Sequence, residues 1–517
     1  MKKLFAAVLL LLPPLSAWPL TIDVYHTSDV HGWYSARPAK WDKEDPKRMI
    51  GGFAVLSNMV KADKNPHILL DSGDTFQGTP EGTLTKGMAT AALMDQLGYS
   101  ACDVGNHDYD YTEASLRAVI AKSSFPWLGA NVYVKKTGEP VDYLKPYTVI
   151  TVAGKRIAVL GLLGTHTATS TLPANVARLG FGNESEAAAK WVGIIRRKEH
   201  PDAVLILSHT GIGMGTYGIT DISTMTFTGD IPPSSTLSEA RASHADVVLG
   251  GHNHVGLLKG YRDPVSGALI AESYWGLTEV SKITLDFDDK TGKLAGSSDE
   301  LLPLWEDKYG EDPAVLATIK RFRDRTAREM DKPVSESAVD LGAARGGLDS
   351  PIGDWFTDAM RRQAGTDAAV QNTAGIRSTL RAGTVRMRDV FEVMPFENTL
   401  VTMTLTGDQL RRLMADNLEG GHSRLQVSGI AVRFKTGADG KPQDIVILRN
   451  GRPVGDSERL TVATNNYLTT GGTGGAVFAE AKDSVDTMRP IRDLLIKDLK
   501  ENPVKALPEA GRIVRQD

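Results

Sequence analysis

The sequence predicts a two-domain α/β protein, and three observations support this fold class. The chain has 517 residues, which is more than one hydrophobic core usually serves. Its hydrophobic fraction of 41% and charged fraction of 24% are those of a globular protein. In the first half of the chain, apolar runs alternate with helical patterns, as expected for a sheet that helices cover on both faces.

The N-terminus has the composition of a secretory signal peptide. Lys2 and Lys3 precede the apolar run 4–12, and the small residues Ser16 and Ala17 follow two prolines. The apolar run is far shorter than the ~20 residues of a membrane-spanning helix. We therefore expect residues 1–17 to be removed and the mature chain to be secreted, to the periplasm in a Gram-negative cell, with no membrane span.

The overall charge argues against binding to nucleic acid, and the cysteine count excludes a disulfide within the chain. A net charge of −4 argues against binding to a nucleic acid polymer, because such binding depends on neutralising many phosphates. Cys102 is the only cysteine, so no disulfide can form within the chain. It lies in an apolar run, and we expect it to be a small buried side chain. The sequence leaves the oligomeric state open.

The first two predicted strands lead to residues that can bind metal ions. The run 20–27 leads to Asp29 and His31, which are two positions apart and would leave a strand end on the same side. The run 67–71 leads through a glycine to Asp74, whose carboxylate could bridge two cations.

Residues 104–110, V-G-N-H-D-Y-D, contain the main candidates for catalysis. Asn106 offers an amide oxygen, which is a hard ligand for a divalent metal. His107 follows it, and an imidazole that a carboxylate orients can donate a proton or stabilise developing negative charge. Asp108 and Asp110 come directly behind it.

Two later apolar runs also lead to histidines. The run 203–207 leads to His209, and a further run leads to His252 and His254. The spacing of apolar and charged residues over 184–199 predicts an amphipathic helix between the strands.

Seven residues at five strand ends form the predicted metal site: Asp29, His31, Asp74, Asn106, His209, His252 and His254. With Asp74 as the bridge, one cation could take Asp29, His31 and His254, and the other Asn106, His209 and His252. Nitrogen and oxygen ligands together suit Zn, Mn, Fe or Co better than Ca. The alternative, scattered residues with unrelated structural roles, does not account for the order of all five motifs.

This set of motifs resembles the calcineurin-like metallophosphoesterases. Residues 26–32, H-T-S-D-V-H-G, together with G-N-H-D-Y-D, are similar to the secreted 5′-nucleotidases. The resemblance implies a four-layer sandwich of two sheets flanked by helices, joined by a linker helix to a smaller α+β substrate-binding domain. It also implies that His107 is catalytic and that Asp110 orients it.

The second half of the chain predicts a connecting helix and a further domain. Residues 311–332 favour a linker helix with one packed face, which could equally belong to the core of either domain. Ser350 and Pro351 predict the start of a helix that continues over 355–363. We therefore expect the metallophosphoesterase domain at 18–310 and the substrate-binding domain at 333–517.

The motifs of this half are similar to the C-terminal domain of the same nucleotidases. They are Q-N-T-A-G-I-R from residue 371, P-F-E-N from 395, Q-V-S-G from 426 and N-N-Y-L from 465. The resemblance implies that Phe396 and Tyr467 enclose a nucleobase, and such stacking is worth ~1–3 kcal/mol per base. It further implies these polar or phosphate contacts to the substrate: Asn372, Asn466, Arg377 and Arg345.

The chain departs from the family pattern at two places. Thr473 stands where the family has an aspartate that binds the ribose hydroxyls, and one hydroxyl cannot bind two others as a carboxylate does. Thr373 and Ala374 stand where the family has glycines. We expect Thr473 to contact the substrate with a weaker preference for ribose.

Together these features predict a secreted enzyme that uses two divalent metal ions to hydrolyse nucleoside 5′-monophosphates, with other nucleotides and nucleotide sugars as further candidates. Water of lowered pKa would attack phosphorus in line with the leaving alcohol. One alternative is a related hydrolase of 2′,3′-cyclic nucleotides, 3′-nucleotides or thiosulfate-type conjugates. Another is a secreted binding protein without activity, which is disfavoured because the ligands, His107 and Asp110 are all present.

Overall fold

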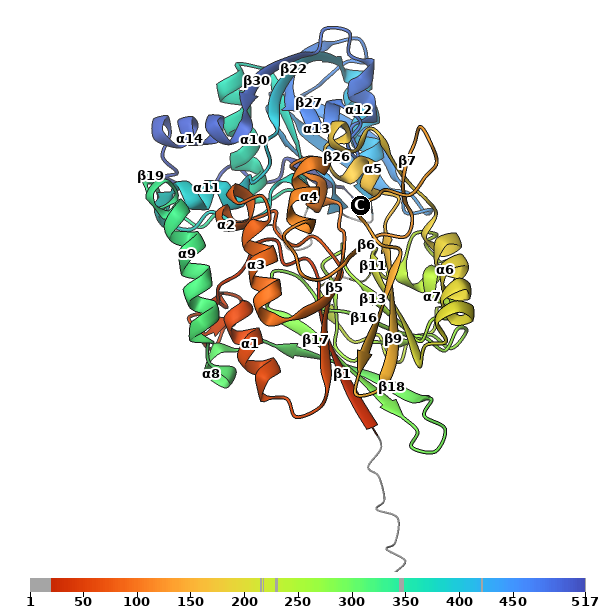
Figure 1. Ribbon diagram of the computed structural model, residues 1–517. Helices are drawn as coiled ribbons and strands as arrows, with labels where there is room; N and C mark the ends of the chain where they lie inside the picture. Colours follow the sequence, from red (N-terminus) through yellow and green to blue (C-terminus); the bar gives the residue numbers. More distant parts are fainter. Residues whose placement is uncertain are drawn as a thin grey trace, which may run out of the picture.

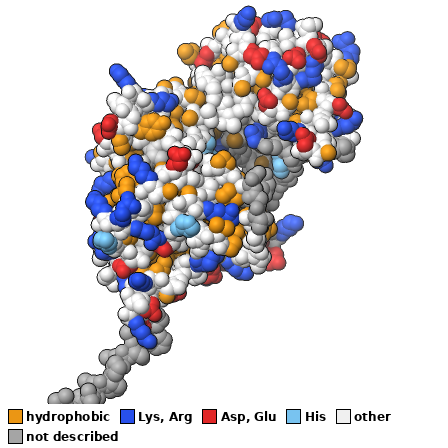
Figure 2. Space-filling model, turned by 90° about the vertical axis from the view of Figure 1, so that its right-hand side faces the viewer, with side chains coloured by type: hydrophobic (Ala, Val, Ile, Leu, Met, Phe, Trp, Pro, Cys, Tyr) orange, Lys and Arg blue, Asp and Glu red, His pale blue; other side chains and the backbone are white. Residues whose placement is uncertain are grey.

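The computed structural model describes residues 20–516, with the exception of 214–215, 217, 228–230, 344–347 and 420–421. The expected signal peptide and Arg345 lie outside the described residues. The two domains stand one above the other in Figure 1 and form two lobes of unequal size in Figure 2. Within the described part of the chain, no helix has the length and apolar character needed to cross a membrane.

The first domain is built on two six-stranded sheets. Their strand orders are β18-β17-β1-β4-β5-β6 and β15-β16-β13-β11-β9-β8. The central strands of each sheet run parallel. The strands of the first sheet are β1 Leu20–Thr27, β4 His67–Asp71, β5 Tyr99–Asp103, β6 Trp127–Leu128, β17 Glu279–Phe287 and β18 Leu294–Pro303. Those of the second are β8 Tyr147–Val152, β9 Lys155–Leu163, β11 Ala203–His209, β13 Val247–Gly250, β15 Tyr261–Arg262 and β16 Leu269–Glu272.

The two sheets pack face to face, and helices cover their outer faces. Apolar side chains such as Val24, Leu70, Leu205 and Leu249 form one core between the sheets. Because both faces of the central strands are buried, these strands are continuous apolar runs. On one side lie α1 (Phe53–Ala62), α3 (Met88–Leu97) and α9 (Pro313–Met330), and on the other α6 (Glu184–Glu199) and α7 (Thr236–Ser243), as Figure 1 shows. The result is the expected four-layer α/β sandwich.

Several local predictions are confirmed. The helix α6 covers residues 184–199, and the Asn183 side chain caps it by accepting a hydrogen bond from the Glu186 N–H. The thiol of Cys102 is free and buried. In the second domain, α10 (Pro351–Ala364) begins at Ser350, whose hydroxyl accepts a hydrogen bond of 3.1 Å from the Gly353 N–H.

The second domain contains a five-stranded sheet and a four-stranded sheet, with the orders β25-β20-β29-β22-β30 and β28-β27-β26-β31. One core lies between the larger sheet and the helices α10, α11 (Met387–Val393) and α14 (Ile491–Glu501). A second core joins the larger sheet to α12 (Gly407–Asn417) and the smaller sheet. The strands are β20 Ala368–Asn372, β22 Thr399–Thr406, β25 Leu425–Ser428, β26 Ala431–Thr436, β27 Pro442–Arg449, β28 Arg452–Pro453, β29 Arg459–Asn465, β30 Val485–Pro490 and β31 Ile513–Arg515.

The helix α9 runs along the first domain and ends beside the second (Figure 1). Val315, Ile319 and Phe322 on its apolar face belong to the core that α1 and α3 share. Directly after the helix, the Asp331 carboxylate accepts a hydrogen bond of 3.2 Å from Arg388 of α11. The packed face therefore belongs to the first domain, whereas the C-terminal end of the helix reaches the second.

Candidate metal and phosphoester site between the domains

The predicted metal ligands meet at the carboxyl ends of strands from both sheets of the first domain. Asp29 and His31 follow β1, Asp74 follows β4, Asn106 follows β5, His209 ends β11, and His252 and His254 follow β13. Packing of the two sheets thus brings all seven predicted ligands to one edge of the sandwich. The fully or almost fully buried members are Asp29, His31, Asp74, Asn106 and His209.

Five of these seven side chains leave left-handed backbone rather than alternating strand positions. Asp29 and His31 have φ angles of 51° and 49°, and Asp74, His252 and His254 have φ angles of 58°, 76° and 56°. Strand alternation therefore does not set the directions of Asp29 and His31, contrary to the prediction, because β1 ends before both residues. Left-handed backbone is costly for residues other than glycine, and such strain is concentrated at functional sites.

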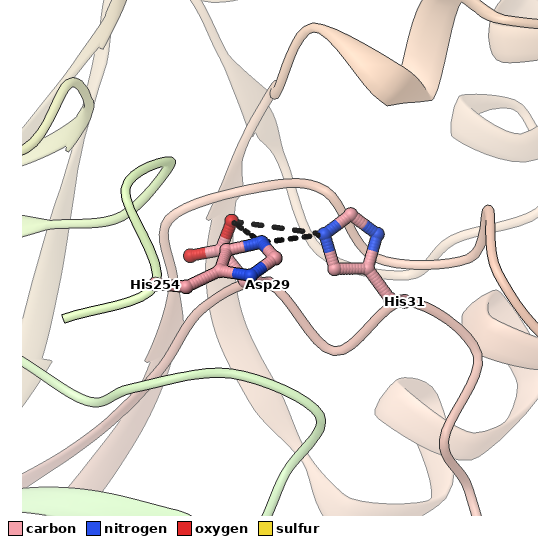
Figure 3. A group of neighbouring side chains, drawn as sticks. All are labelled: Asp29, His31 and His254. Atoms are coloured by element: carbon pink, nitrogen blue, oxygen red, sulfur yellow. Dashed lines mark hydrogen bonds and ion pairs between the residues drawn. The ribbon is translucent and has the colours of Figure 1, made fainter. Parts of the chain in front are cut away.

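Asp29, His31 and His254 form one compact group of possible ligand atoms (Figure 3). Oδ1 of Asp29 lies 3.9 Å from His31 Nε2 and 3.6 Å from His254 Nε2, and the two Nε2 atoms are 3.0 Å apart. In Figure 3 the carboxylate points toward both imidazole rings. One cation could contact all three side chains.

Asp29 also belongs to a second compact group, with Asp74 and His209. Oδ2 of Asp74 lies 3.2 Å from His209 Nε2 and 3.8 Å from His31 Nε2. Asp74 therefore stands between histidines of the two groups, as a bridging carboxylate must. The geometry additionally places Asp29 in both groups, whereas the sequence analysis assigns it to one.

Asn106 and His252 lie beside these two groups. Oδ1 of Asn106 accepts a hydrogen bond of 3.0 Å from His252 Nδ1, and its Nδ2 donates to the Ser170 carbonyl at 3.0 Å. The backbone N–H of His252 donates to both carboxylate oxygens of Asp29, at 3.1 and 3.0 Å. The structure thus brings Asn106 and His252 to the cluster. Asn106 is hydrogen-bonded to His252, and His252 is hydrogen-bonded to the carboxylate of Asp29, which belongs to both compact groups.

Backbone carbonyls fix the tautomers of two histidines in the cluster. Nδ1 of His31 lies 2.8 Å from the Gln77 carbonyl oxygen, and Nδ1 of His209 lies 2.6 Å from that of Ser72. Because a carbonyl oxygen only accepts, both Nδ1 atoms carry a hydrogen, and in the neutral imidazole each Nε2 therefore presents a lone pair. Within the described residues, His209 Nε2 is buried and makes no hydrogen bond of good geometry, and the oxygen of Asp74 lies 3.2 Å from it. This donor set fits divalent metal ions.

The charges of the cluster also favour a cation. Burial raises the pKa of Asp29 to about 7. Burial lowers the pKa of His209, but the carboxylates of Asp74 and Asp29 outweigh that effect and raise it to about 10. A divalent cation would stabilise both ionised carboxylates and would replace the proton on His209, since imidazole binds metal in its neutral form.

His107 is held beside the cluster by Asp110. Nδ1 of His107 lies 2.9 Å from Asp110 Oδ2, and the His107 backbone N–H donates to Asp74 Oδ1 at 2.7 Å. The other oxygen of Asp110 accepts a hydrogen bond of 2.7 Å from the Thr171 hydroxyl. Burial lowers the pKa of His107, but the charges of Asp110 and Asp74 outweigh it, so the pKa is raised above its usual value. An imidazole in this setting can hold a proton on Nε2, the nitrogen that Asp110 leaves free.

Three supporting residues have no role in the sequence analysis. The Asp108 carboxylate accepts hydrogen bonds from three backbone N–H groups, those of Asp74, Thr75 and Gly105. The His166 ring stacks on His252 with 3.7 Å between centroids, and the Trp275 ring stacks on His254 with 5.4 Å between centroids. The position of Asp108 directly after His107 was a signal in the sequence from which its supporting role could have been predicted. His166 and Trp275 lie near no motif that predicts a supporting role.

A cavity of about 400 Å³ opens between the domains at this cluster. The predicted residues that line it from the first domain are Asp74, Asn106, His107, Asp110, His252 and His254. Those that line it from the second domain are Asn372, Arg377, Phe396, Tyr467 and Thr473. Residues that are far apart in sequence therefore face one cavity.

Two side chains of the second domain reach the cluster itself. The ring centroid of Phe396 lies 5.5 Å from that of His107. The Arg377 guanidinium donates a hydrogen bond of 3.0 Å to His31 Nε2, and its central carbon lies 6.0 Å from the Phe396 ring centroid. The cavity thus combines an aromatic face and a cationic fork next to the candidate metal ligands.

Tyr467 and Thr473 join the two domains at another part of the cavity. The Tyr467 hydroxyl donates a hydrogen bond of 2.5 Å to the Thr169 carbonyl oxygen of the first domain. The Thr473 hydroxyl donates to the same oxygen at 3.2 Å, and its backbone N–H donates to the Tyr467 hydroxyl at 3.1 Å. In this arrangement the Thr473 hydroxyl hydrogen is used in a contact between domains.

The two predicted asparagine contacts differ in position. Asn372 lines the cavity, and Asn465 holds its Oδ1 with a hydrogen bond of 2.9 Å. Asn466 does not line the cavity, and its Oδ1 accepts a hydrogen bond of 3.2 Å from the backbone N–H of Thr399. The structure therefore brings Asn372, but not Asn466, to the cavity.

Comparison with known proteins decides the family. Residues 22–256 match the model of the calcineurin-like phosphoesterases, and residues 333–480 match that of the 5′-nucleotidase C-terminal domain. The chain belongs to the two-domain 5′-nucleotidases. A 5′-nucleotidase precursor from Thermus thermophilus has a similar structure, with a TM-score of 0.83, 26% sequence identity, and coverage of 96% of this chain and 100% of that chain.

Relatives by sequence agree with this family. A 5′-nucleotidase of Vibrio cholerae is 26% identical over 540 residues, which cover 95% of this chain and 93% of that protein. The trifunctional nucleotide phosphoesterase protein YfkN of Bacillus subtilis is 26% identical over 97% of this chain, but the chain spans only 35% of its length. The matched calcineurin-like phosphoesterase model implies a phosphoester hydrolase in which divalent metal ions take part.

Proposed function

We propose that this chain is a secreted enzyme that hydrolyses nucleoside 5′-monophosphates to nucleoside and phosphate with two divalent metal ions. One observation carries the proposal: four of the candidate metal ligands, His107 and the Phe396 ring of the second domain line the same cavity. A nucleotide whose phosphate lies at the cluster can therefore place its base against the other domain. The proposed organisation is a signal peptide at 1–17, a catalytic domain at 18–310, a linker at 311–332 and a substrate-binding domain at 333–517.

The cluster would hold the cations as a pair that shares carboxylates. Asp29, His31 and His254 would hold one cation, and Asn106, His209 and His252 the other, with Asp74 between them. The position of Asp29 in both compact groups supports a contribution of this carboxylate to each. Zn, Mn, Fe or Co suits these donors. When bound, such cations polarise phosphoryl oxygens and lower the pKa of water.

His107, Asp110 and Arg377 would act on the phosphoryl group. In the reaction the oxygen of water adds to phosphorus, and the ester oxygen leaves and takes up a proton. His107 Nε2 would stabilise charge on a phosphoryl oxygen or give the proton to the leaving oxygen. Asp110 would fix the tautomer that presents this nitrogen. The forked guanidinium of Arg377 would bind the phosphate or the ribose.

The second domain would select the leaving group. Phe396 and Tyr467 line the cavity and would stack on the base, and Asn372 would supply a polar contact. The hydrogen bond of Asn466 to Thr399 supports a structural role for that side chain instead.

A second candidate function follows from the contact between Thr473 and Thr169. Since the Thr473 hydroxyl donates to a carbonyl of the first domain, it offers no donor to a free ribose diol in this arrangement. Substrates without that diol, such as 2′,3′-cyclic nucleotides, are therefore the second candidate class.

Metal analysis and a comparison of substrates test the proposal. The substrates are AMP, 2′,3′-cyclic AMP and p-nitrophenyl phosphate, each assayed before and after removal of metal with a chelator. We expect about two metal ions per chain, loss of activity with the chelator, and the highest kcat/KM with AMP. Activity on the cyclic nucleotide without activity on AMP would favour the second candidate.

A further inference from the structure

The short helix α5 (Thr167–Ser170) of the first domain lies against the second domain (Figure 1). The backbone carbonyl of Thr169 in this helix accepts hydrogen bonds of 2.5 and 3.2 Å from the hydroxyls of Tyr467 and Thr473. Tyr467 and Thr473 also line the large cavity between the domains. Part of the cavity wall that the second domain supplies is therefore tied to the backbone of α5.

The next two residues of the chain, Ser170 and Thr171, contact residues of the candidate active site. The Ser170 carbonyl accepts a hydrogen bond of 3.0 Å from Nδ2 of Asn106, a candidate metal ligand. The Thr171 hydroxyl donates a hydrogen bond of 2.7 Å to Oδ1 of Asp110. The other oxygen of Asp110 is the one that holds His107. Three successive residues therefore join the second domain, a candidate ligand and the carboxylate that orients the imidazole.

The hydroxyl of Thr171 is used by the protein itself. Thr171 lines the large cavity, but it is only 2% exposed. A hydroxyl has one hydrogen, so Thr171 cannot donate to a substrate while it donates to Asp110. Its bond to Oδ1, together with the contact of His107 at Oδ2, fixes the plane of the Asp110 carboxylate. A partner of this kind sets the orientation of the imidazole without touching the substrate.

We propose that Thr171 is a positioning residue for the carboxylate of Asp110, and that docking of the second domain on α5 sets its own position. This inference rests on the proposed function, because it concerns the same hydrolysis. One residue separates the Thr169 carbonyl from Thr171, so a backbone shift at the docking point also moves the Thr171 hydroxyl. A displacement of about 1 Å can lower a rate about 100-fold. Thr473, which replaces the aspartate of the family pattern, then acts through α5 and not on the ribose.

The first test removes the Thr171 hydroxyl. Thr171→Val should lower kcat for AMP about tenfold, with KM changed by less than about twofold and the metal content unchanged, because the carboxylate loses one of its partners. Thr171→Ser keeps the hydroxyl and should recover most of kcat. Thr167→Val is the matched control, since the Thr167 hydroxyl is also buried in α5 but makes no hydrogen bond within the described residues. It should keep the wild-type kcat.

The second test combines Thr171→Val with Thr473→Val. Thr473→Val alone should lower kcat for AMP about threefold, since it loses one neutral hydrogen bond to α5. If Thr473 acts through Thr171, the double variant should lose about tenfold, like Thr171→Val alone. Independent effects would multiply to about thirtyfold. Multiplied losses, or an unchanged kcat in Thr473→Val, would overturn the role of domain docking.

Three results would overturn the role of Thr171 while the proposed function stands. They are an unchanged kcat in Thr171→Val, no recovery in Thr171→Ser, and a loss of metal or a rise of KM that accounts for the effect. If Thr171→Val does not fold, Thr171→Ala removes the same hydroxyl from a smaller side chain. A wild type inactive on AMP would overturn the proposed function and the inference with it.

Discussion

Arg377 of the second domain donates a hydrogen bond to His31 of the first, with 3.0 Å between Nη2 and Nε2. Because Nδ1 of His31 carries the hydrogen, this bond uses the Nε2 lone pair that a metal ion would need. The positive charge of Arg377 thus lies within a buried cluster that also contains Asp29 and Asp74. A cation bound at His31 would free the guanidinium to contact phosphoryl oxygens.

Substitution of Arg377 is expected to weaken catalysis without loss of metal. We expect Arg377→Ala to lower kcat/KM for AMP about 100-fold or more, as removal of a donor to a reacting oxyanion does elsewhere. Arg377→Lys should recover only part of this loss, because lysine keeps the charge but not the forked geometry. Steady-state kinetics with metal analysis of each variant measures both effects. Reduced metal content in Arg377→Ala would contradict a role at the phosphoryl group.

Asp74→Asn is expected to abolish activity along with metal binding. The carboxylate lies near both His209 and His31, so its charge would act on both cations. An amide of the same size keeps the shape but removes that charge. Elemental analysis should show fewer metal ions per chain than in the wild type. Asp110→Asn is the control, since Asp110 contacts His107 rather than the compact groups. It should keep the metals.

His107→Ala is expected to keep the metals but to lose turnover. The imidazole is bonded to Asp110 and lies outside both compact ligand groups, so its removal leaves those ligands in place. Loss of a positioned acid or base lowers kcat by ~10²–10⁴-fold. The comparison needs kcat and metal content from the same preparation. Turnover close to that of the wild type would remove His107 from the mechanism.

Phe396→Ala is expected to raise KM for AMP more than KM for p-nitrophenyl phosphate. If the ring stacks on the base, its loss should raise KM for AMP about tenfold, whereas KM for p-nitrophenyl phosphate should rise much less. Phe396→Leu keeps much of the apolar volume but not the aromatic face, so it should resemble Phe396→Ala with AMP. An equal rise of KM for both substrates would argue against stacking.

The buried carboxyl of Glu239 on α7 predicts a pH dependence of stability. Its Oε1 accepts hydrogen bonds of 2.9 Å from the hydroxyls of Ser208 and Thr210, which flank His209. Burial raises the pKa of Glu239 from 4.5 to about 8. Between these values the folded state binds more protons than the unfolded state. The free energy of unfolding therefore falls as the pH rises through this interval.

Glu239→Gln should remove this part of the pH dependence, because the amide resembles the protonated carboxyl and does not titrate. We expect the wild type to lose more stability than the variant between pH 5 and pH 8, by an amount on the order of a few kcal/mol. Denaturant unfolding at the two pH values, with metal held in excess, measures the difference. The exposed Glu186 provides the control. In Glu186→Gln the free energy of unfolding should change with pH as it does in the wild type. If the free energy of unfolding of Glu239→Gln fell with pH as much as that of the wild type, the prediction would be contradicted.

The sequence by itself determined the features that depend on local order. The extent of α6 follows from the periodicity of its apolar residues, and Asn183 caps it through the backbone N–H three residues later. The start of α10 follows from Ser350, which caps that helix in the same way. The seven candidate ligands could be named because each follows an apolar run that packing forces into a buried strand. Parallel strands of one sheet then bring such ends to a common edge.

Only the tertiary structure decided how those residues are combined. The hydrogen bonds of His252 to Asp29 join residues 223 positions apart, and that of Arg377 to His31 spans 346 positions. The same holds for the sharing of Asp29 and for the contact of Thr473 with Thr169. A local pattern specifies which side chain follows a strand. The distance between two such side chains is set by how two sheets and two domains pack, and by left-handed turns that this packing keeps in place.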